Sequence, residues 1–283
     1  MSCYLCGSDN SKLRNGKVRD NDALKVLECL SCSLVYLSDF KHVDEMFYED
    51  SNMHTSFDLD KWNKETDFDD KRRYEFTKKL ITNKDILDFG SGNGGYLKYA
   101  KLSSKSVAAI ELEKAIEEEY RKHKLDLYKG IKDVEKEFDV ITMFHVLEHL
   151  SDPKSILMEL SKKLKKDGKL IIEVPNSEDA LLTLYENKAF SEFTYWSCHL
   201  FLFNSKTLNE LIKQCGLKID FIKHVQRYPI SNHLYWLSKN KPGGHQQWGG
   251  FIDSDELSNA YENSLASVGK TDTLIAQISK VES

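Results

Sequence analysis

Short apolar runs alternate with amphipathic segments along most of the chain. Runs typical of buried strands occupy residues 85–89, 106–111, 125–128, 138–144, 169–174, 217–225 and 273–278. Between them, apolar residues recur at helical spacing in residues 69–80, 94–102, 113–123 and 205–215, and in a helix that begins at Pro153. Strands that alternate with helices pair in parallel through right-handed crossovers. The pattern therefore predicts an α/β fold in which helices cover both faces of a mostly parallel sheet.

Three stretches that depart from this alternation indicate the domain organisation. Residues 1–40 are rich in cysteine, and residues 41–80 combine charges with aromatic side chains before the helical pattern at their end. We therefore expect a small N-terminal element, a connecting helical arm and a main domain at 81–283. Within that domain, residues 226–270 are too many for a simple connection between the last two strands. We expect them to form a lid at the ligand-binding edge of the sheet.

The overall composition is that of an ordinary soluble globular protein. The 283 residues are 40% hydrophobic and 30% charged, with a formal net charge of −5. An acidic balance provides no general attraction to nucleic acid or to anionic membranes. No apolar run approaches the roughly 20 residues of a membrane span, and the first residues do not resemble a signal peptide. We expect a cytoplasmic protein without a membrane span, for which nucleic acid is an unfavoured partner.

Four of the six cysteines lie close together near the start of the chain. Cys3 and Cys6 form one C-x-x-C motif, and Cys29 and Cys32 form a second. In a reducing compartment such pairs are more often metal ligands than disulfides. Two turns of this kind supply four thiolates to one Zn²⁺ ion, in a closed tetrahedral shell with a structural role. We expect a zinc ribbon in residues 1–40, against the alternative of four unligated cysteines.

The most informative stretch is the glycine-rich turn after the first strand of the main domain. Such a backbone can approach a cofactor closely, and the amides of the helix that follows face negative groups. Gly90, Gly92 and Gly95 satisfy the G-x-G-x-x-G pattern of dinucleotide-binding folds. Asp88 and Gly94 extend the same run into D-x-G-x-G-x-G, which is typical of proteins that bind S-adenosylmethionine (SAM). The turn by itself is therefore compatible with hydride transfer and with methyl transfer.

Neighbouring residues separate these alternatives. Asp88 suits the methionyl ammonium group of SAM, directly or through water, whereas dinucleotide binders usually carry an apolar residue there. Short-chain dehydrogenases need a Tyr-x-x-x-Lys pair near the middle of the sheet, but the matches at 120–124 and 128–132 fall just after the second strand. Glu111 ends the second strand, where it could bind the ribose of either cofactor. It therefore does not distinguish a dinucleotide from SAM. The residues favour methyl transfer.

Residues 138–153, taken with the glycine-rich turn, closely resemble the fourth-strand region of class I SAM-dependent methyltransferases. The resemblance covers about residues 70–225. It implies a Rossmann-like sheet of seven strands, the last of them antiparallel, with SAM over the carboxyl ends of strands one, two and four. By position it assigns Asp88, Gly90, Gly92 and Gly94 to the methionine end of SAM, Glu111 to the ribose, Leu112 and the backbone at Ile131 to adenine, and Phe144 and His145 to the sulfonium.

The N-terminal four-cysteine element, joined to such a domain, resembles bacterial methyltransferases of sugar, capsule and antibiotic pathways, as does the segment 195–203. We therefore expect a small-molecule acceptor and O-methylation of a sugar or nucleotide-linked sugar, in surface-polysaccharide or secondary-metabolite synthesis. The larger C-methyltransferases of deoxysugars carry a further C-terminal domain. The given sequence shows no counterpart of it, which favours O-methylation over C-methylation. C- or N-methylation of a modified sugar remains an alternative. Two alternatives of a different functional class also remain. One is a zinc-ribbon-directed RNA or protein methyltransferase, and the other is a noncatalytic SAM-binding adaptor.

A sugar hydroxyl needs a base to take its proton during transfer, and histidine suits this role near neutral pH. His199 is the first candidate because it lies between strands five and six, beside the expected acceptor cleft, and His145 is the second. Polar and aromatic residues of the lid and of the segment before it suit a hydroxyl-rich ligand. The expected acceptor-binding residues are Tyr195, Arg227, Asn232, His233 and Trp236. Alternatively, the lid aromatics fill the underside of the lid or form the contact of a homodimer.

Overall fold

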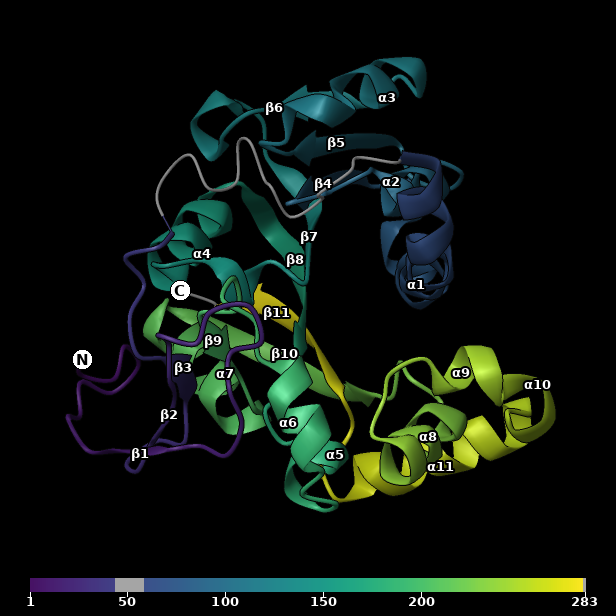
Figure 1. The fold of residues 1–283 in the computed structure, drawn as a ribbon. Helices are drawn as coiled ribbons and strands as arrows, with labels where there is room; N and C mark the ends of the chain where they lie inside the picture. Colours follow the sequence, from purple (N-terminus) through teal and green to yellow (C-terminus); the bar gives the residue numbers. More distant parts are fainter. Residues whose placement is uncertain (44–58, 282–283) are drawn as a thin grey trace.

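The computed structural model describes residues 1–43 and 59–281 (Figure 1). The main sheet has seven strands in the order β10-β11-β8-β7-β4-β5-β6. They are β4 (Asp85–Phe89), β5 (Ser106–Ile110), β6 (Asp126–Tyr128), β7 (Phe138–Phe144), β8 (Leu164–Pro175), β10 (Leu217–Val225) and β11 (Thr273–Lys280). β11 runs antiparallel to both of its neighbours, and all other neighbouring pairs are parallel. The predicted Rossmann-like α/β fold with an antiparallel last strand is confirmed.

Helices cover both faces of this sheet. The helices that precede β10 in the chain are α1 (Leu59–Ile81), α2 (Gly95–Ala100), α3 (Glu117–Lys122), α4 (Pro153–Lys162), α5 (Ala180–Thr183), α6 (Lys188–Thr194) and α7 (Ser205–Gln214). One apolar core joins Leu87 of β4 with Leu157 of α4 and Leu208 of α7. A second core joins Ile86 of β4 with Leu97 of α2. Adjacent residues of a strand point to opposite faces, so one strand contributes to both cores.

Two elements begin earlier than the sequence pattern predicts. α1 begins at Leu59 rather than at residue 69, because its first turns are held by contacts with the glycine-rich turn, such as the 2.9 Å hydrogen bond from Asn93 Nδ2 to Thr66 Oγ1. β8 begins at Leu164 rather than at residue 169, and the polar, partly exposed residues at its start form no apolar run. Part of the expected connecting arm, residues 44–58, lies outside the described residues.

A second, four-stranded sheet contains the N-terminal residues. Its strands are β1 (Ser11–Leu13), β2 (Val26–Cys29), β3 (Val35–Leu37) and β9 (Phe201–Leu202), and all neighbours are antiparallel. β9 comes from the segment between α6 and α7, so regions far apart in the sequence share one sheet. The buried ring of Phe201 lies 5.1 Å from the rings of both Tyr4 and Phe40. The N-terminal element therefore shares a sheet and a core with the main domain.

The segment between β10 and β11 folds into a helical layer, seen at the lower right of Figure 1. We call residues 226–270 the lid segment. Its helices are α8 (Ile230–Lys239), α9 (Gly244–Gln247), α10 (Gly249–Ile252) and α11 (Asp255–Ser267). The carboxylate of Asp272, just after the segment, accepts hydrogen bonds at 3.0 Å from the backbone amides of Arg227 and Tyr228 at its start. Among the described helices, none is long and apolar enough to cross a membrane.

Candidate active site

A cavity of about 1630 Å³ lies beside the carboxyl ends of the parallel strands. Its walls come from α1, from the glycine-rich turn after β4, from residues that follow β5 and β7, and from the lid segment. Open α/β folds bind their ligands at this edge of the sheet. Pockets for one drug-sized ligand measure roughly 300–1,000 Å³. This cavity therefore has room for a cofactor together with a second molecule.

The glycine-rich turn leaves little room for side chains at Gly90 and Gly92. Gly90 and Gly92 have φ values of +70° and +54°. A Cβ atom on Gly90 would lie 2.5 Å from the side chain of Val146, and one on Gly92 would lie 3.2 Å from Trp62. Glycine tolerates both the positive φ and the close approach. The local packing therefore accounts for the glycines that the sequence carries here.

Two acidic residues flank this turn. Asp88 of β4 is 3% exposed and accepts a hydrogen bond from Thr142 Oγ1 at 2.6 Å. Burial raises the pKa of Asp88 to about 7, so a cationic ligand would stabilise its charged form. Glu111 follows β5 and accepts hydrogen bonds at 2.7 Å from the backbone amides of Gly92 and Leu112. Both carboxylates line the cavity.

His145 directly follows β7 and has an unusual backbone conformation. Its φ is +55°, a left-handed value that costs a non-glycine residue roughly 1–2 kcal/mol. Nδ1 of the ring lies 3.1 Å from Oε1 of the buried Glu148. Nε2 lies 2.8 Å from Arg227 Nη1 and 3.1 Å from Oε1 of the buried Glu173. Backbone strain that is held by such contacts is typical of functional sites.

Glu173 of β8 is the centre of a buried ion network. Arg72 and Arg73 of α1 donate hydrogen bonds to its carboxylate at distances of 2.8 to 3.1 Å. Burial alone would raise the pKa of Glu173, but the two arginines and the neighbouring imidazole hold it well below its usual range. Asp69 pairs with Arg72 at 2.9 Å and also with Arg227 of the lid segment. The network therefore connects α1, β8 and the lid segment around one imidazole ring.

Comparison with known proteins identifies the family. A family model described as a methyltransferase domain matches residues 61–220. The chain belongs to this family. It is a SAM-dependent methyltransferase, which confirms the predicted reaction class, methyl transfer.

Two curated relatives each match a little more than half of the chain. An uncharacterized protein of Methanocaldococcus jannaschii is 29% identical over 163 residues, which cover 57% of this chain and 78% of the relative. A ubiquinone biosynthesis O-methyltransferase of Hydrogenovibrio crunogenus is 26% identical over 185 residues, which cover 57% of this chain and 77% of the relative.

Solved structures show the same fold at low sequence identity. One is the complex between the Haloferax volcanii Trm112 methyltransferase activator and the putative methyltransferase, with a TM-score of 0.52 and 14% identity over 80% of this chain and 99% of that chain. Another is a SAM-dependent methyltransferase of Thermotoga maritima, described as a possible histamine N-methyltransferase, with a TM-score of 0.51 and 20% identity over 78% of this chain and 94% of that chain. At these identities the likeness concerns the fold.

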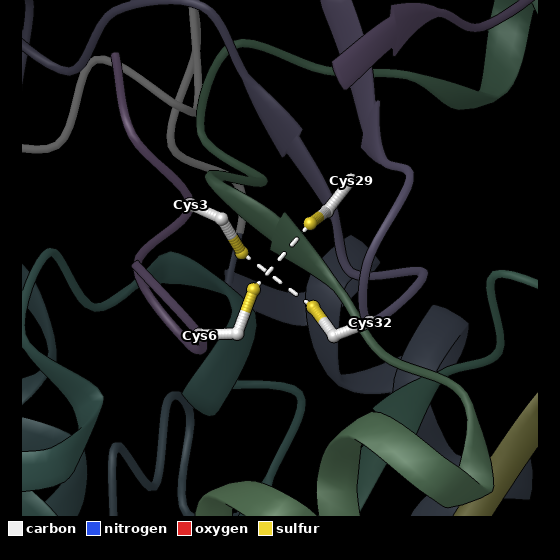
Figure 2. A group of neighbouring side chains, drawn as sticks. All are labelled: Cys3, Cys6, Cys29 and Cys32. Carbon is white, nitrogen blue, oxygen red and sulfur yellow. Dashed lines mark hydrogen bonds between the residues drawn. The ribbon is translucent and has the colours of Figure 1, made fainter. Parts of the chain in front are cut away.

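The four N-terminal cysteines converge on one point (Figure 2). Sγ of Cys3 lies 3.5 Å from Sγ of Cys32, and Sγ of Cys6 lies 3.5 Å from Sγ of Cys29. All four sulfurs lie within 4.8 Å of one another. In a tetrahedral site with Zn–S bonds of about 2.3 Å, the sulfurs stand roughly 3.8 Å apart. The donor set and its spacing fit a four-thiolate metal site, and none of the four cysteines lines the cavity.

Most of the expected cofactor residues line the cavity. They are Asp88, Gly90, Gly92, Glu111, Leu112, Ile131 and Phe144. His145 and Arg227, expected for catalysis and for acceptor binding, line it as well. Gly94 does not, since its Cβ direction faces Tyr120 and Leu125 behind the turn, with contacts at 3.2 and 3.3 Å.

The other expected acceptor residues are packed inside the protein. Trp236 is 2% exposed and packs against two phenylalanine rings of α6, at centroid distances of 5.2 and 5.3 Å. Asn232 and His233 are buried on the same helix, α8, and Tyr195 is buried just after α6. These four residues and His199 are not among those that line the cavity.

Sequence reasoning singled out His145 and Arg227 but not the other members of the ion network. Glu173 offered a signal, because it is a lone charge within the apolar run 170–174, and a buried charge requires partners. The sequence offered no such signal for Asp69, Arg72 and Arg73, since charged residues at helical spacing usually form a solvated face. Their role depends on contacts with residues about a hundred positions away.

Proposed function

We propose that this methyltransferase transfers the methyl group of SAM to a hydroxyl oxygen of a sugar or nucleotide-linked sugar, in surface-polysaccharide or secondary-metabolite synthesis. The supporting observation is the wall of the cavity formed by the lid segment, which carries hydrogen-bonding side chains. They are Gln226, Arg227, Tyr228, His245, Gln246, Asp253, Ser258 and Tyr261. A hydroxyl-rich acceptor would find partners along this wall. The Hydrogenovibrio crunogenus relative, named as an O-methyltransferase, supports oxygen as the methylated atom.

We propose that SAM lies along the glycine-rich turn. Asp88 would bind the methionyl ammonium group, since a positive charge offsets the cost of ionising a buried carboxyl. Glu111 would accept hydrogen bonds from the ribose hydroxyls. Ile131 and Phe144, both largely buried and both on the cavity wall, would supply apolar contacts to the adenine and to the sulfonium end. Gly90 would permit the close approach of the backbone to the cofactor.

We propose His145 as the base in place of His199, because His145 lines the cavity and His199 does not. Donation from Nδ1 to Glu148 selects the tautomer whose Nε2 lone pair can take a proton. Burial would raise the pKa of Glu148, but the hydrogen bond and the charge of His145 lower it to about 2. Glu148 is therefore ionised at neutral pH and stabilises the imidazolium that proton transfer creates.

Bound SAM would supply an activated methyl group, so the protein has to align the acceptor and remove its proton. The acceptor hydroxyl replaces Arg227 Nη1 at Nε2 of His145. Its proton would pass to Nε2 as its oxygen takes the methyl group that bound SAM supplies, with S-adenosylhomocysteine as the other product. Glu173 Oε1, 3.1 Å from Nε2, accepts a hydrogen bond from the protonated ring. Arg227 stays paired with Asp69.

We also propose that the four-cysteine cluster binds one structural Zn²⁺ ion. Four thiolates complete a tetrahedral shell and leave no position for substrate. The ion would hold the turn at Cys3 and Cys6 against the turn at Cys29 and Cys32, as their converging side chains suggest (Figure 2).

A product-detecting screen of free and nucleotide-linked sugars with SAM tests the acceptor. We expect equal amounts of S-adenosylhomocysteine and of a sugar that is heavier by one methylene unit, with the new methyl group on oxygen by NMR. Methylation at carbon or nitrogen would contradict the reaction type. Methylation of RNA or protein, with no sugar product, would contradict the acceptor class. Tight SAM binding without turnover on any of these acceptors would favour an adaptor.

A further inference from the structure

We propose that His149, Cys198 and His199 form a second metal site, which binds a divalent ion of the zinc type beside the cavity. One ligand atom from each residue lies within 4.8 Å of the others. The rings of the two histidines meet nearly at right angles, with centroids 4.8 Å apart. The backbone hydrogen bond from Leu200 N to Glu148 O, at 2.8 Å, fixes the two chain segments that carry these ligands.

The donor set suits zinc and related metals. Two imidazole nitrogens and one thiolate are borderline to soft ligands, which Zn²⁺ takes readily and which Mg²⁺ and Ca²⁺ do not prefer. Cys198 is 2% exposed, so its sulfur is shielded from solvent. The set is separate from the ribbon cluster, because it contains none of Cys3, Cys6, Cys29 and Cys32.

The charge around the site also suits a divalent cation. Glu148 is fully buried, and its Oε2 has no hydrogen-bond partner among the described residues. Its Oε1 lies 4.0 Å from Nε2 of His149. A thiolate at Cys198 together with this carboxylate would balance a charge of +2, and buried charges require such pairing. Before an ion binds, the negative charge comes from Glu148, and metal binding would release the proton of the Cys198 thiol.

The position of the site suggests a role in the reaction. His149 lines the cavity, so an ion held by it would border the space for the acceptor. Three protein ligands leave one position of a tetrahedral ion for water or substrate, which is the pattern of catalytic rather than structural zinc. An acceptor oxygen bound there would be a stronger nucleophile at neutral pH. This last step rests on the proposed function, whereas the metal site itself does not.

Metal titration of the full chain tests the site. The protein is stripped with a chelator under reducing conditions and titrated with Zn²⁺ against a chromophoric competitor. We expect two ions per chain for the wild type and one for Cys198→Ser. In this variant the affinity of the second site for Zn²⁺ should fall at least 100-fold. Cys215→Ser is the matched control, since Cys215 is a buried cysteine outside both clusters, and it should keep two ions.

The outcomes of this titration are distinct from those of the acceptor screen. Equal stoichiometry in wild type and Cys198→Ser would overturn the second site. If circular dichroism shows that Cys198→Ser does not fold, His199→Gln decides by the same count. Two ions without methylation of any sugar would leave the site standing and contradict the proposed function alone.

Discussion

Two residues of the cavity are held in states that are unfavourable for folding. His145 has a left-handed backbone conformation without being glycine, and Asp88 is a carboxyl group buried to 3% exposure. Strain and desolvation of this kind lower stability. The same two groups are those that the proposed reaction uses for proton transfer and for cofactor binding. Conservative substitutions can therefore separate a functional role from a structural one.

The variant His145→Asn removes the ring and keeps a residue that tolerates positive φ. We expect kcat to fall by about 10²- to 10⁴-fold, the usual contribution of a positioned base. The Kd for SAM should change much less than kcat, because the proposed contacts of Asp88, Glu111 and the glycine-rich turn with the cofactor remain. Steady-state kinetics and calorimetric SAM titration measure both. A kcat within tenfold of the wild type would exclude His145 as the base.

The variant Asp88→Asn tests the buried carboxyl through the pH dependence of stability. The unfolded-state pKa is roughly 3.9, and the folded-state pKa is about 7. Between these values the folded protein keeps a proton that the unfolded chain has lost, so the free energy of unfolding of the wild type falls as pH rises. Asparagine removes this contribution.

We therefore expect Asp88→Asn to gain stability over the wild type between pH 5 and pH 7, with a constant difference above that, in urea unfolding. At pH 8 its SAM affinity should be at least tenfold weaker, because the neutral amide does not attract the ammonium group. If the free energies of unfolding of wild type and Asp88→Asn changed in parallel with pH, the pKa of Asp88 would not be raised in the folded protein. Unchanged SAM affinity would refute its role in cofactor binding.

At the scale of elements, the lid segment combines a packed inner side with a polar wall. α8 directs Trp236 away from the cavity and into the rings of α6. Arg227, just before α8, reaches across to Asp69 of α1 and to His145 after β7. The lid segment is therefore anchored on both sides of the cavity, and its packing determines where the polar wall stands.

Trp236→Ala should act on stability rather than directly on the acceptor. Truncating a buried tryptophan costs about 3–5 kcal/mol, which corresponds to a fall in Tm of roughly ten degrees for a chain of this size. Trp236→Phe is the matched control and should lose less, because it keeps an aromatic contact with α6. Differential scanning calorimetry measures both. An unchanged Tm with a raised acceptor KM would instead show that Trp236 stacks on the sugar.

At the scale of the whole molecule, the sequence predicted what local patterns determine. The seven strands follow from apolar runs, their parallel pairing from the alternating helices, and the turn at Gly90 from its composition. The strand Phe201–Leu202 could not be predicted, because two residues show no periodicity. The orientation of Trp236 could not be predicted either, since an aromatic residue on an amphipathic helix looks the same whether it meets a protein ring or a ligand. Both features, the strand and the orientation of the tryptophan, depend on contacts between residues far apart in the sequence.

The shared strand implies that the N-terminal element and the main domain unfold together. Phe201 and Leu202 of β9 pair with β3, and Phe201 is fully buried against Tyr4 and Phe40. Unfolding of the N-terminal element would expose these apolar side chains of the main domain, at about 25 cal/mol for each Å². Metal binding at the four cysteines should therefore stabilise the whole chain.

The variant Cys6→Ser removes one thiolate of the ribbon cluster and leaves His149, Cys198 and His199 intact. We expect a single calorimetric transition in wild type and variant, with the Tm of the variant lower by several degrees and SAM affinity reduced in parallel near that temperature. Cys215→Ser controls for the loss of a cysteine elsewhere and should shift Tm less. If the ribbon were an independent unit, Cys6→Ser would produce two transitions. The transition at higher temperature, identified as that of the main domain by its shift when SAM is added, would then keep the wild-type Tm. This result would show that the shared sheet does not couple the N-terminal element to the main domain.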